Sequence, residues 1–258
     1  MGELYAGGDL WPKQDPLLHT TVLRPPVPHE WLFQVGLVSL QRLGDFVALR
    51  LFHAWTVAAL GLGVFALCLR AGRDVVLAAL ATGVWATLSW YRLIQLRPEL
   101  VSFGAILVLT ALVFTRSGPI GRARSGIVLV LFVAWVNAHS LFAIGLCLLV
   151  AAALGAVLEF GLVRLRLGVE SEERGALALR RAGAFAALAV AAAAVSWLNP
   201  QGFAQHATFF TESSGGLIWK IQDDFLPWRP WAWPEGRGPA FTPLAWALSN
   251  ALYLACFA

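Results

Sequence analysis

Residues 140–163 read SLFAIGLCLLVAAALGAVLEFGLV, an apolar run with a single charged side chain, Glu159. As a helix, this run is longer than the roughly 30 Å hydrocarbon core of a bilayer. Similar runs recur along the 258-residue chain, which is 59% hydrophobic and only 13% charged. A soluble domain carries about a quarter charged residues. The sequence therefore predicts an all-α, polytopic transmembrane helical bundle.

About six or seven runs are long enough, or nearly long enough, to cross the membrane. We expect the spans at 46–69, 75–91, 98–115, 125–137, 140–163, 183–198 and 242–258. The polar stretch 137–140 separates two runs that, as one helix, would be about twice as long as the hydrocarbon core is thick. We therefore expect the chain to turn there. Residues 31–44 are apolar with polar interruptions, which predicts a short amphipathic helix in the membrane interface.

The connectors between the runs are of two kinds. Ten of the 19 basic residues lie in the short connectors 70–74, 116–124 and 164–182, and the positive-inside rule makes such loops cytoplasmic. In the last of them, we expect 170–181 to be a solvated loop. Glu159 lies near the same end of its span, and we expect it either to reach the interface or to pair with Arg164 or Arg166.

The other connectors then lie on the outer face and carry most of the acidic, His, Trp and Pro residues. We expect four regions along the chain: an outer loop with the interfacial helix over 1–45, a transmembrane bundle over 46–198, a second outer loop over 199–241, and a truncated transmembrane helix over 242–258.

The net charge of +4 does not indicate nucleic-acid binding. The Arg residues cluster at the ends of apolar runs, where membrane orientation and lipid headgroups account for them. Each of the three Cys residues lies inside an apolar run and reads as a small hydrophobic side chain. The sequence contains no Gly-rich phosphate-binding loop, so we expect no nucleotide-binding domain.

Short motifs follow one another along the expected outer face. They are GGDLWPKQDPLLHT at 7–20, PHEWL at 28–32, RPEL at 97–100, WVNAH at 135–139 and LNPQG at 198–202. Their order and spacing resemble the bacterial polytopic membrane glycosyltransferases of the GT-C type, which use polyprenyl-phosphate-linked sugars. The resemblance covers nearly the whole chain.

This resemblance implies a partial GT-C-like membrane domain in the bacterial inner membrane, with its active face toward the periplasm. It implies transfer of a sugar from a polyprenyl-phosphate donor to a glycan, lipid or protein acceptor. In that family a catalytic acidic residue usually follows the first transmembrane helix. The sequence begins with MGELY after that point, so we expect a fragment that lacks this helix and is inactive alone. The alternative is a complete protein with an exported N-terminal tail.

Candidate catalytic residues are the outer-face carboxylates Asp15 and Glu30, because a carboxylate can deprotonate an acceptor hydroxyl or hold a metal. Asp15 could instead start a turn before Pro16, and Glu30 could instead place a negative charge at a helix N-terminus. Candidates for binding phosphate are Arg97, Arg92 and His29. Arg92 could also simply reach the interface, and His29 could be a polar cap.

Asn137 and His139 lie at a helix break, where they could line a wet cavity or hold the turn by interhelical hydrogen bonds. Asp223 and Asp224 could face the acceptor or could simply be solvated. We identify no cofactor; a divalent metal is possible, but its ligands are unknown because the histidines are scattered.

Two other functions remain open. One is a transporter of a lipid-linked substrate, although we see no polar residues across the membrane midplane and no inverted repeat. The other is a non-catalytic membrane scaffold whose Trp- and Pro-rich segment 227–234 docks a partner.

Overall fold

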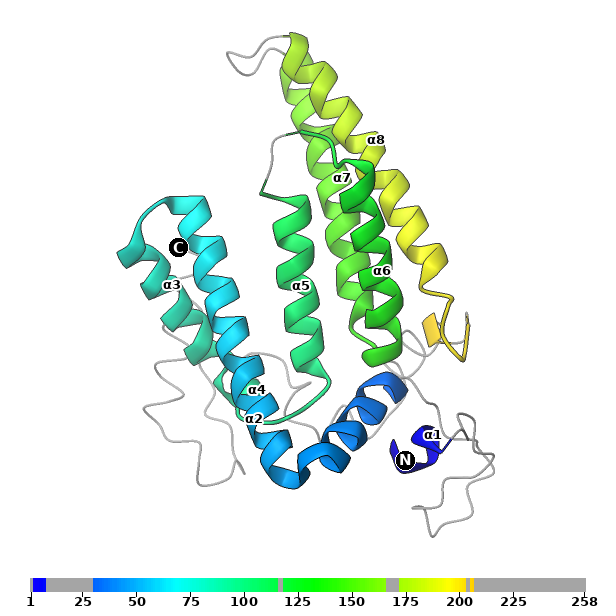
Figure 1. Ribbon diagram of the computed structural model, residues 1–258. Coiled ribbons are helices and arrows are strands. Elements are labelled where there is room, and N and C mark those ends of the chain that lie inside the picture. Colours follow the sequence, from blue (N-terminus) through cyan, green and yellow to red (C-terminus); the bar gives the residue numbers. More distant parts are fainter. Residues whose placement is uncertain (1, 8–29, 116–117, 166–171, 203–204, 207–258) are drawn as a thin grey trace, which may run out of the picture.

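The computed structural model describes residues 2–7, 30–115, 118–165, 172–202 and 205–206 (Figure 1). Within these ranges the secondary structure is helical and contains no strand, which confirms the all-α prediction. Several predicted features lie outside the described residues: Asp15, His29, Asp223, Asp224, the segment 227–234 and the expected span 242–258.

The described part of the chain forms eight helices. They are α1 (Gly2–Ala6), α2 (Trp31–Gly72), α3 (Val75–Leu88), α4 (Trp90–Leu93), α5 (Glu99–Val113), α6 (Arg122–Ala138), α7 (Phe142–Arg164) and α8 (Glu172–Val195). Three of them, α2, α7 and α8, are long and apolar enough to cross a membrane, whereas α3 and α5 are apolar but shorter. The described residues thus give a membrane protein with three candidate spans, and the expected six or seven are not confirmed.

Helix α2 bends at Gly44 and Asp45, whose backbone angles are not helical. Unbent, its 42 residues would extend roughly 63 Å, about twice the thickness of the hydrocarbon core. Figure 1 shows the first half of α2, in blue, running across the end of the bundle, and the second half running along it. The separate short helix predicted over 31–44 is therefore present, and its place in the membrane interface stays a prediction.

The predicted turn between the fourth and fifth runs is also confirmed. Helix α6 ends at Ala138 and α7 begins at Phe142, and His139 between them has an extended backbone (φ −162°, ψ 146°). In Figure 1 this turn, the turn between α4 and α5, and the first half of α2 lie at one end of the bundle, which we call the polar end. The end of α7 and the start of α8 lie at the opposite, arginine-rich end.

The prediction of a solvated loop over 170–181 is wrong, because α8 already begins at Glu172. Glu159 of α7 forms ion pairs with Arg174 (3.2 Å) and Arg181 (2.9 Å) of α8. The predicted partner Arg164 does not pair with it, and the other predicted partner, Arg166, lies outside the described residues. Arg174 and Arg181 are seven residues apart, so a helix presents both on the face toward α7. The charges that favoured a loop thus stabilise a helix pair.

The main core lies among α5, α6, α7 and α8. It includes the fully buried side chains Leu109, Val128, Phe132, Trp135, Phe142 and Leu149. Helix α7 allows the large Trp135 ring to pack closely because residue 145 is glycine. A Cβ atom at Gly145 would lie 2.5 Å from Cζ3 of Trp135, which is too close for any side chain. This close packing fixes an indole ring at the polar end of the bundle.

Candidate functional site

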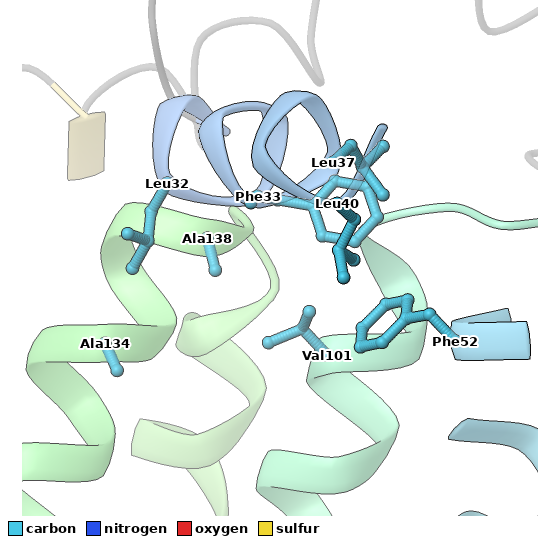
Figure 2. A pocket seen from close by; sticks show the side chains of 9 residues that line it. Leu32, Phe33, Leu37, Leu40, Phe52, Val101, Ala134 and Ala138 are labelled. Carbon is cyan, nitrogen blue, oxygen red and sulfur yellow. The ribbon is translucent and has the colours of Figure 1, made fainter. Parts of the chain in front are cut away.

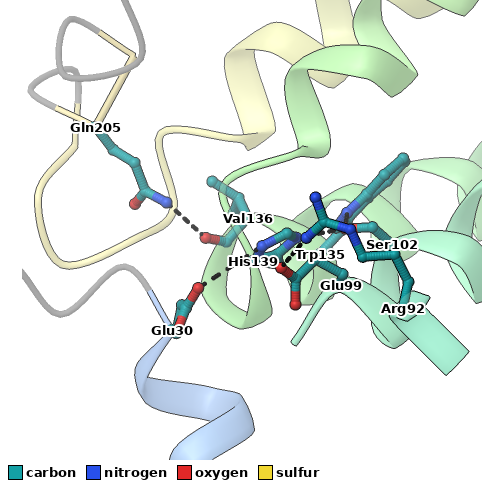
Figure 3. Close-up of polar contacts among 8 residues, drawn as sticks. All are labelled: Glu30, Arg92, Glu99, Ser102, Trp135, Val136, His139 and Gln205. Carbon is teal, nitrogen blue, oxygen red and sulfur yellow. Dashed lines mark hydrogen bonds and ion pairs between the residues drawn. The ribbon is translucent and has the colours of Figure 1, made fainter. Parts of the chain in front are cut away.

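Polar side chains from four parts of the chain meet at the polar end (Figure 3). Glu30 precedes α2, Arg92 belongs to α4, and Glu99 and Ser102 belong to α5. Trp135 lies in the last turn of α6, and His139 directly follows that helix. We call these six residues the polar cluster. They come together because the start of α2, the start of α5 and the end of α6 lie at the same level of the bundle (Figure 1).

His139 lies at the centre of the polar cluster. Its Nε2 atom is 3.7 Å from Oε1 of Glu30, and its Nδ1 atom is 2.7 Å from Oγ of Ser102. The His139 side chain is only 7% exposed, whereas that of Glu30 is 27% exposed. The carboxylate of Glu30 is therefore the more accessible of the two groups.

Glu99 is a second carboxylate in the polar cluster. One of its oxygens pairs with Arg92 at 3.0 Å. The other oxygen, Oε2, is buried and has no hydrogen-bond partner among the described residues. In the sequence, Glu99 stands inside the RPEL motif, and no pattern there singles it out. Its position in the first turn of α5 is a common place for a stabilising negative charge.

The surroundings of Glu30 favour its neutral form. Burial, followed by the negative charge of Glu99, raises the pKa of Glu30 from 4.5 to about 7. Glu30 is the N-cap residue of α2, yet its side chain makes no capping hydrogen bond. A carboxyl group that titrates near neutral pH is suited to accept and release protons.

Asn137 lies beside the polar cluster but is used for hydrogen bonds within the protein. Its Oδ1 accepts from Nε1 of Trp31 at 2.8 Å, and its Nδ2 donates to the carbonyls of Val133 and Leu198. These bonds tie the start of α2 and the segment after α8 to the end of α6. Asn137 thus holds Trp31, and with it the adjacent Glu30, against the bundle.

Gln205 makes a similar link, which no sequence pattern indicated. Its Nε2 donates to the carbonyl of Val136 at 2.9 Å (Figure 3), and its side chain is buried. Arg97, in contrast, is half-buried in the turn between α4 and α5, and its guanidinium has no hydrogen-bond or ion-pair partner among the described residues. An arginine of this kind is open to an external anion.

An apolar cavity of about 380 Å³ lies under the first half of α2. Figure 2 shows side chains from this helix, from α5 and from α6 pointing into it. The lining residues are Leu32, Phe33, Gly36, Leu37, Leu40, Phe52, Val101, Ala134 and Ala138. Val101 and Ala138 directly adjoin Ser102 and His139 in the sequence, so the cavity and the polar cluster share the walls formed by α5 and α6.

The described residues contain no group of three or more His, Cys, Asp or Glu side chains that could hold a metal ion. The possible divalent metal therefore stays a prediction. No protein-family model, curated protein or solved structure matches the chain. The resemblance to GT-C glycosyltransferases accordingly rests on the sequence motifs alone.

Proposed function

We propose that this chain is part of a GT-C-type membrane glycosyltransferase, which transfers a sugar from a polyprenyl-phosphate carrier to an acceptor at the periplasmic face of a bacterial inner membrane. The observation that carries this proposal is the shared wall between the polar cluster and the apolar cavity. Transfer from a lipid carrier needs an apolar site for the carrier and a proton acceptor within reach of it. In this proposal α3, α5 and α6 also cross the bilayer, which gives six spans with α2, α7 and α8.

Glu30 is the proposed base. With a pKa of about 7, Glu30 is ionised in a useful fraction of molecules at neutral pH. Its carboxylate is also a stronger base than an ordinary glutamate, which helps it to take a proton from the acceptor hydroxyl. The acceptor oxygen forms a bond to the sugar carbon as the bond from that carbon to the phosphate oxygen breaks. The phosphate leaves with the electron pair, and the hydroxyl proton goes to Glu30.

Positive charge for the departing phosphate comes from the turn between α4 and α5. Arg92 is paired with Glu99, whereas Arg97 has no internal partner among the described residues. An arginine can make two parallel hydrogen bonds to a phosphate group. We therefore assign phosphate binding mainly to Arg97. The apolar cavity beside the polar cluster would take part of the carrier's hydrocarbon chain, as its wholly apolar lining supports.

The direct test compares Glu30→Gln with Glu159→Gln in membranes from cells that produce each variant within the full-length protein, because we expect the chain alone to be inactive. The membranes are given radiolabelled polyprenyl-phosphate sugars, and both transferred label and label that crosses the membrane are measured. We expect Glu30→Gln to lose about 10²-fold or more of the transfer. Glu159→Gln removes a carboxylate of nearly equal exposure at the opposite end and should change transfer less than about threefold.

Equal transfer by wild type and Glu30→Gln, with equal amounts of inserted protein, would overturn the proposal. Label that crosses the membrane without transfer would indicate a transporter, and neither process would indicate a scaffold. A second arm measures binding of polyprenyl phosphate alone. Arg97→Gln should weaken it about tenfold through the loss of charged hydrogen bonds. Arg180→Gln, an exposed arginine of α8, should not.

A further inference from the structure

Two buried residues of the polar cluster lie behind His139 and cannot touch a substrate. Ser102 is completely buried and Trp135 is 1% exposed. Nε1 of Trp135 donates to Oγ of Ser102 at 2.7 Å, and the same oxygen is 2.7 Å from Nδ1 of His139. A line of hydrogen bonds thus runs from the core to the side of His139 that faces away from Glu30.

The chemistry of these groups fixes the direction of the line. An indole N–H only donates, so the oxygen of Ser102 accepts from Trp135. This oxygen could also accept a second hydrogen bond, but the buried hydroxyl hydrogen of Ser102 would then have no acceptor among the described residues. We therefore infer that it donates to Nδ1 of His139. A ring nitrogen that accepts a hydrogen bond carries no proton, so a neutral imidazole bears its hydrogen on the other nitrogen, Nε2. That nitrogen lies toward Oε1 of Glu30 (Figure 3).

We propose that Ser102 and Trp135 are positioning residues that hold His139 in its Nε2–H tautomer, so that the imidazole presents a hydrogen-bond donor to the carboxylate of Glu30. The contacts between Ser102, His139 and Glu30 superficially resemble a nucleophilic triad. A nucleophile must reach its substrate, however, and the oxygen of Ser102 is enclosed in the core.

The consequence for catalysis rests on the proposed function. The distance of 3.7 Å between Nε2 and Oε1 is too long for a direct hydrogen bond. An acceptor hydroxyl at hydrogen-bond distance from both atoms would accept from Nε2–H and donate its own hydrogen to Glu30. His139 would keep its proton throughout and would fix which lone pair of the acceptor oxygen faces the sugar. With the hydrogen on Nδ1 instead, Nε2 would compete with Glu30 for the hydroxyl hydrogen.

The indole that starts the line is itself held in place. The close approach of α7 at Gly145 leaves the Trp135 ring no room to move toward that helix. The ring also packs against Phe132, with 5.7 Å between the ring centroids. Its N–H is therefore directed at Ser102 by the packing of the core.

Nitrogen NMR of the full chain in lipid bilayers tests this proposal directly. The protein has five His residues, and a His139→Asn sample assigns the signals of His139. At about two pH units above the ordinary histidine pKa, we expect the wild type to show a protonated Nε2 and an unprotonated Nδ1. A protonated Nδ1 in the wild type would overturn the proposal without reference to any variant.

The variant Ser102→Ala then tests the role of the hydroxyl. We expect the ratio of Nε2–H to Nδ1–H tautomers to fall about two- to tenfold, as the loss of one hydrogen bond predicts; an unchanged ratio would exclude Ser102 as the positioning residue. The matched control is Ser196→Ala, because Ser196 is also fully buried and lies 2.8 Å from Nε2 of another histidine, His206. It should change the signals of His206 and leave those of His139 as they are.

This measurement is independent of sugar transfer. A wild-type Nε2–H tautomer together with full transfer by Glu30→Gln would reject the proposed function and retain the assignment of Ser102 and Trp135. A wild-type Nδ1–H tautomer together with a loss of transfer in Glu30→Gln would reject the assignment of Ser102 and Trp135 and retain the proposed function.

Discussion

Glu30 at the polar end and Glu159 at the arginine-rich end have nearly the same exposure, 27% and 26% of their side chains. Their surroundings are opposite. Glu159 lies between two arginines of α8, each within 3.2 Å. Glu30 faces His139 at 3.7 Å and experiences the negative charge of Glu99. At equal exposure, the charge of Glu159 is therefore compensated by arginines, whereas the pKa of Glu30 is raised.

This comparison separates two uses of a carboxylate in one helical bundle. At the arginine-rich end, opposite charges on α7 and α8 pair with each other and fasten the two helices together. At the polar end, Arg92 pairs with Glu99, and Glu30 has no arginine partner among the described residues. The remaining negative charge makes proton uptake by Glu30 easier. We regard this local charge imbalance as the physical basis of the candidate site.

The largest expected effect comes from the packing that supports the polar end. Gly145→Val adds a side chain where even a Cβ atom would lie 2.5 Å from Trp135, so we expect a loss of about 3 kcal/mol of stability. The control is Gly161→Val, on the same helix toward the arginine-rich end, where a Cβ would meet nothing within 4 Å. It should change stability by less than about 0.5 kcal/mol.

The free energy of unfolding of both glycine variants is measured in detergent micelles. If Gly145→Val were as stable as Gly161→Val, the Trp135 ring would be adaptable, and its role in directing Ser102 would fail. If both variants were strongly destabilised, α7 would have a contact near Gly161 that the described residues do not contain.

The second effect is a pH dependence of stability that Glu30 imposes. Its pKa is raised from 4.5 in the unfolded chain to about 7 in the folded protein, so the folded state holds the proton more tightly. The resulting stabilisation is fully present below pH 4.5 and is lost as the pH rises through about 7. The shift corresponds to about 3 kcal/mol, and partial exposure reduces this to about 2 kcal/mol.

Among the described residues, the charged and titratable groups that act on Glu30 are His139, at 3.7 Å, and Glu99, which is itself paired with Arg92. Thermal unfolding at several pH values should show that Glu30→Gln removes most of the decline between pH 5 and 8. Glu159→Gln should keep the decline, because Glu30 is intact. A decline that persists unchanged in Glu30→Gln would assign it to another group and contradict the charge imbalance at the polar end.

Much of the fold could be predicted from the sequence because apolar runs and polar breaks have a simple relation to helices. The turn at 137–140 and the helix over 31–44 are examples. The start of α8 could not be predicted in this way, because a stretch with both acidic and basic residues resembles a solvated loop. The signal for a helix was present in the spacing of Arg174 and Arg181, but their partner Glu159 is on a different helix.

The polar cluster was only partly predictable. Glu30, Arg92 and His139 stood out as polar residues at the ends of apolar runs, and the structure brings them together. Ser102 did not stand out, since one serine in an apolar run attracts little attention. A buried hydroxyl group nevertheless needs a hydrogen-bond partner, and that requirement was the available signal. The identity of the partners, Trp135 and His139, depends on how α5 packs on α6.

The third prediction concerns the hydrogen bond that holds the start of α2. Trp31→Phe removes the N–H that donates to Oδ1 of Asn137, so we expect a loss of about 1 kcal/mol. Hydrogen exchange of residues 31–43 should become faster, because this half of α2 is anchored there. Trp55→Phe on the second half of α2, where the ring is 70% exposed, is the matched control and should leave exchange unchanged. Equal exchange in both variants would mean that the anchor lies elsewhere.

The smallest expected effect compares Asp45 and Arg73, the two non-glycine residues with positive φ in the part of the chain that the structure describes, one near each end of α2's second half. Arg73 (φ 55°, ψ 20°) ends the helix in the left-handed region, and its N–H donates to the carbonyl of Leu69, which is a common helix end. Asp45 (φ 52°, ψ −150°) lies in a region that only glycine adopts without strain.

Asp45→Gly should therefore relieve strain at the bend of α2. The greater freedom of glycine in the unfolded chain offsets part of the gain, which leaves about 0.5 kcal/mol of added stability. Asp45→Ala tests the reason, because alanine removes the same charge but has the same backbone restriction, and it should give no gain. Equal stabilisation by Gly and Ala in thermal unfolding would trace the effect to the charge of Asp45. The bend would then be an unstrained joint, and the first half of α2 would be held in place by its contacts with the rest of the protein, such as the hydrogen bond between Trp31 and Asn137.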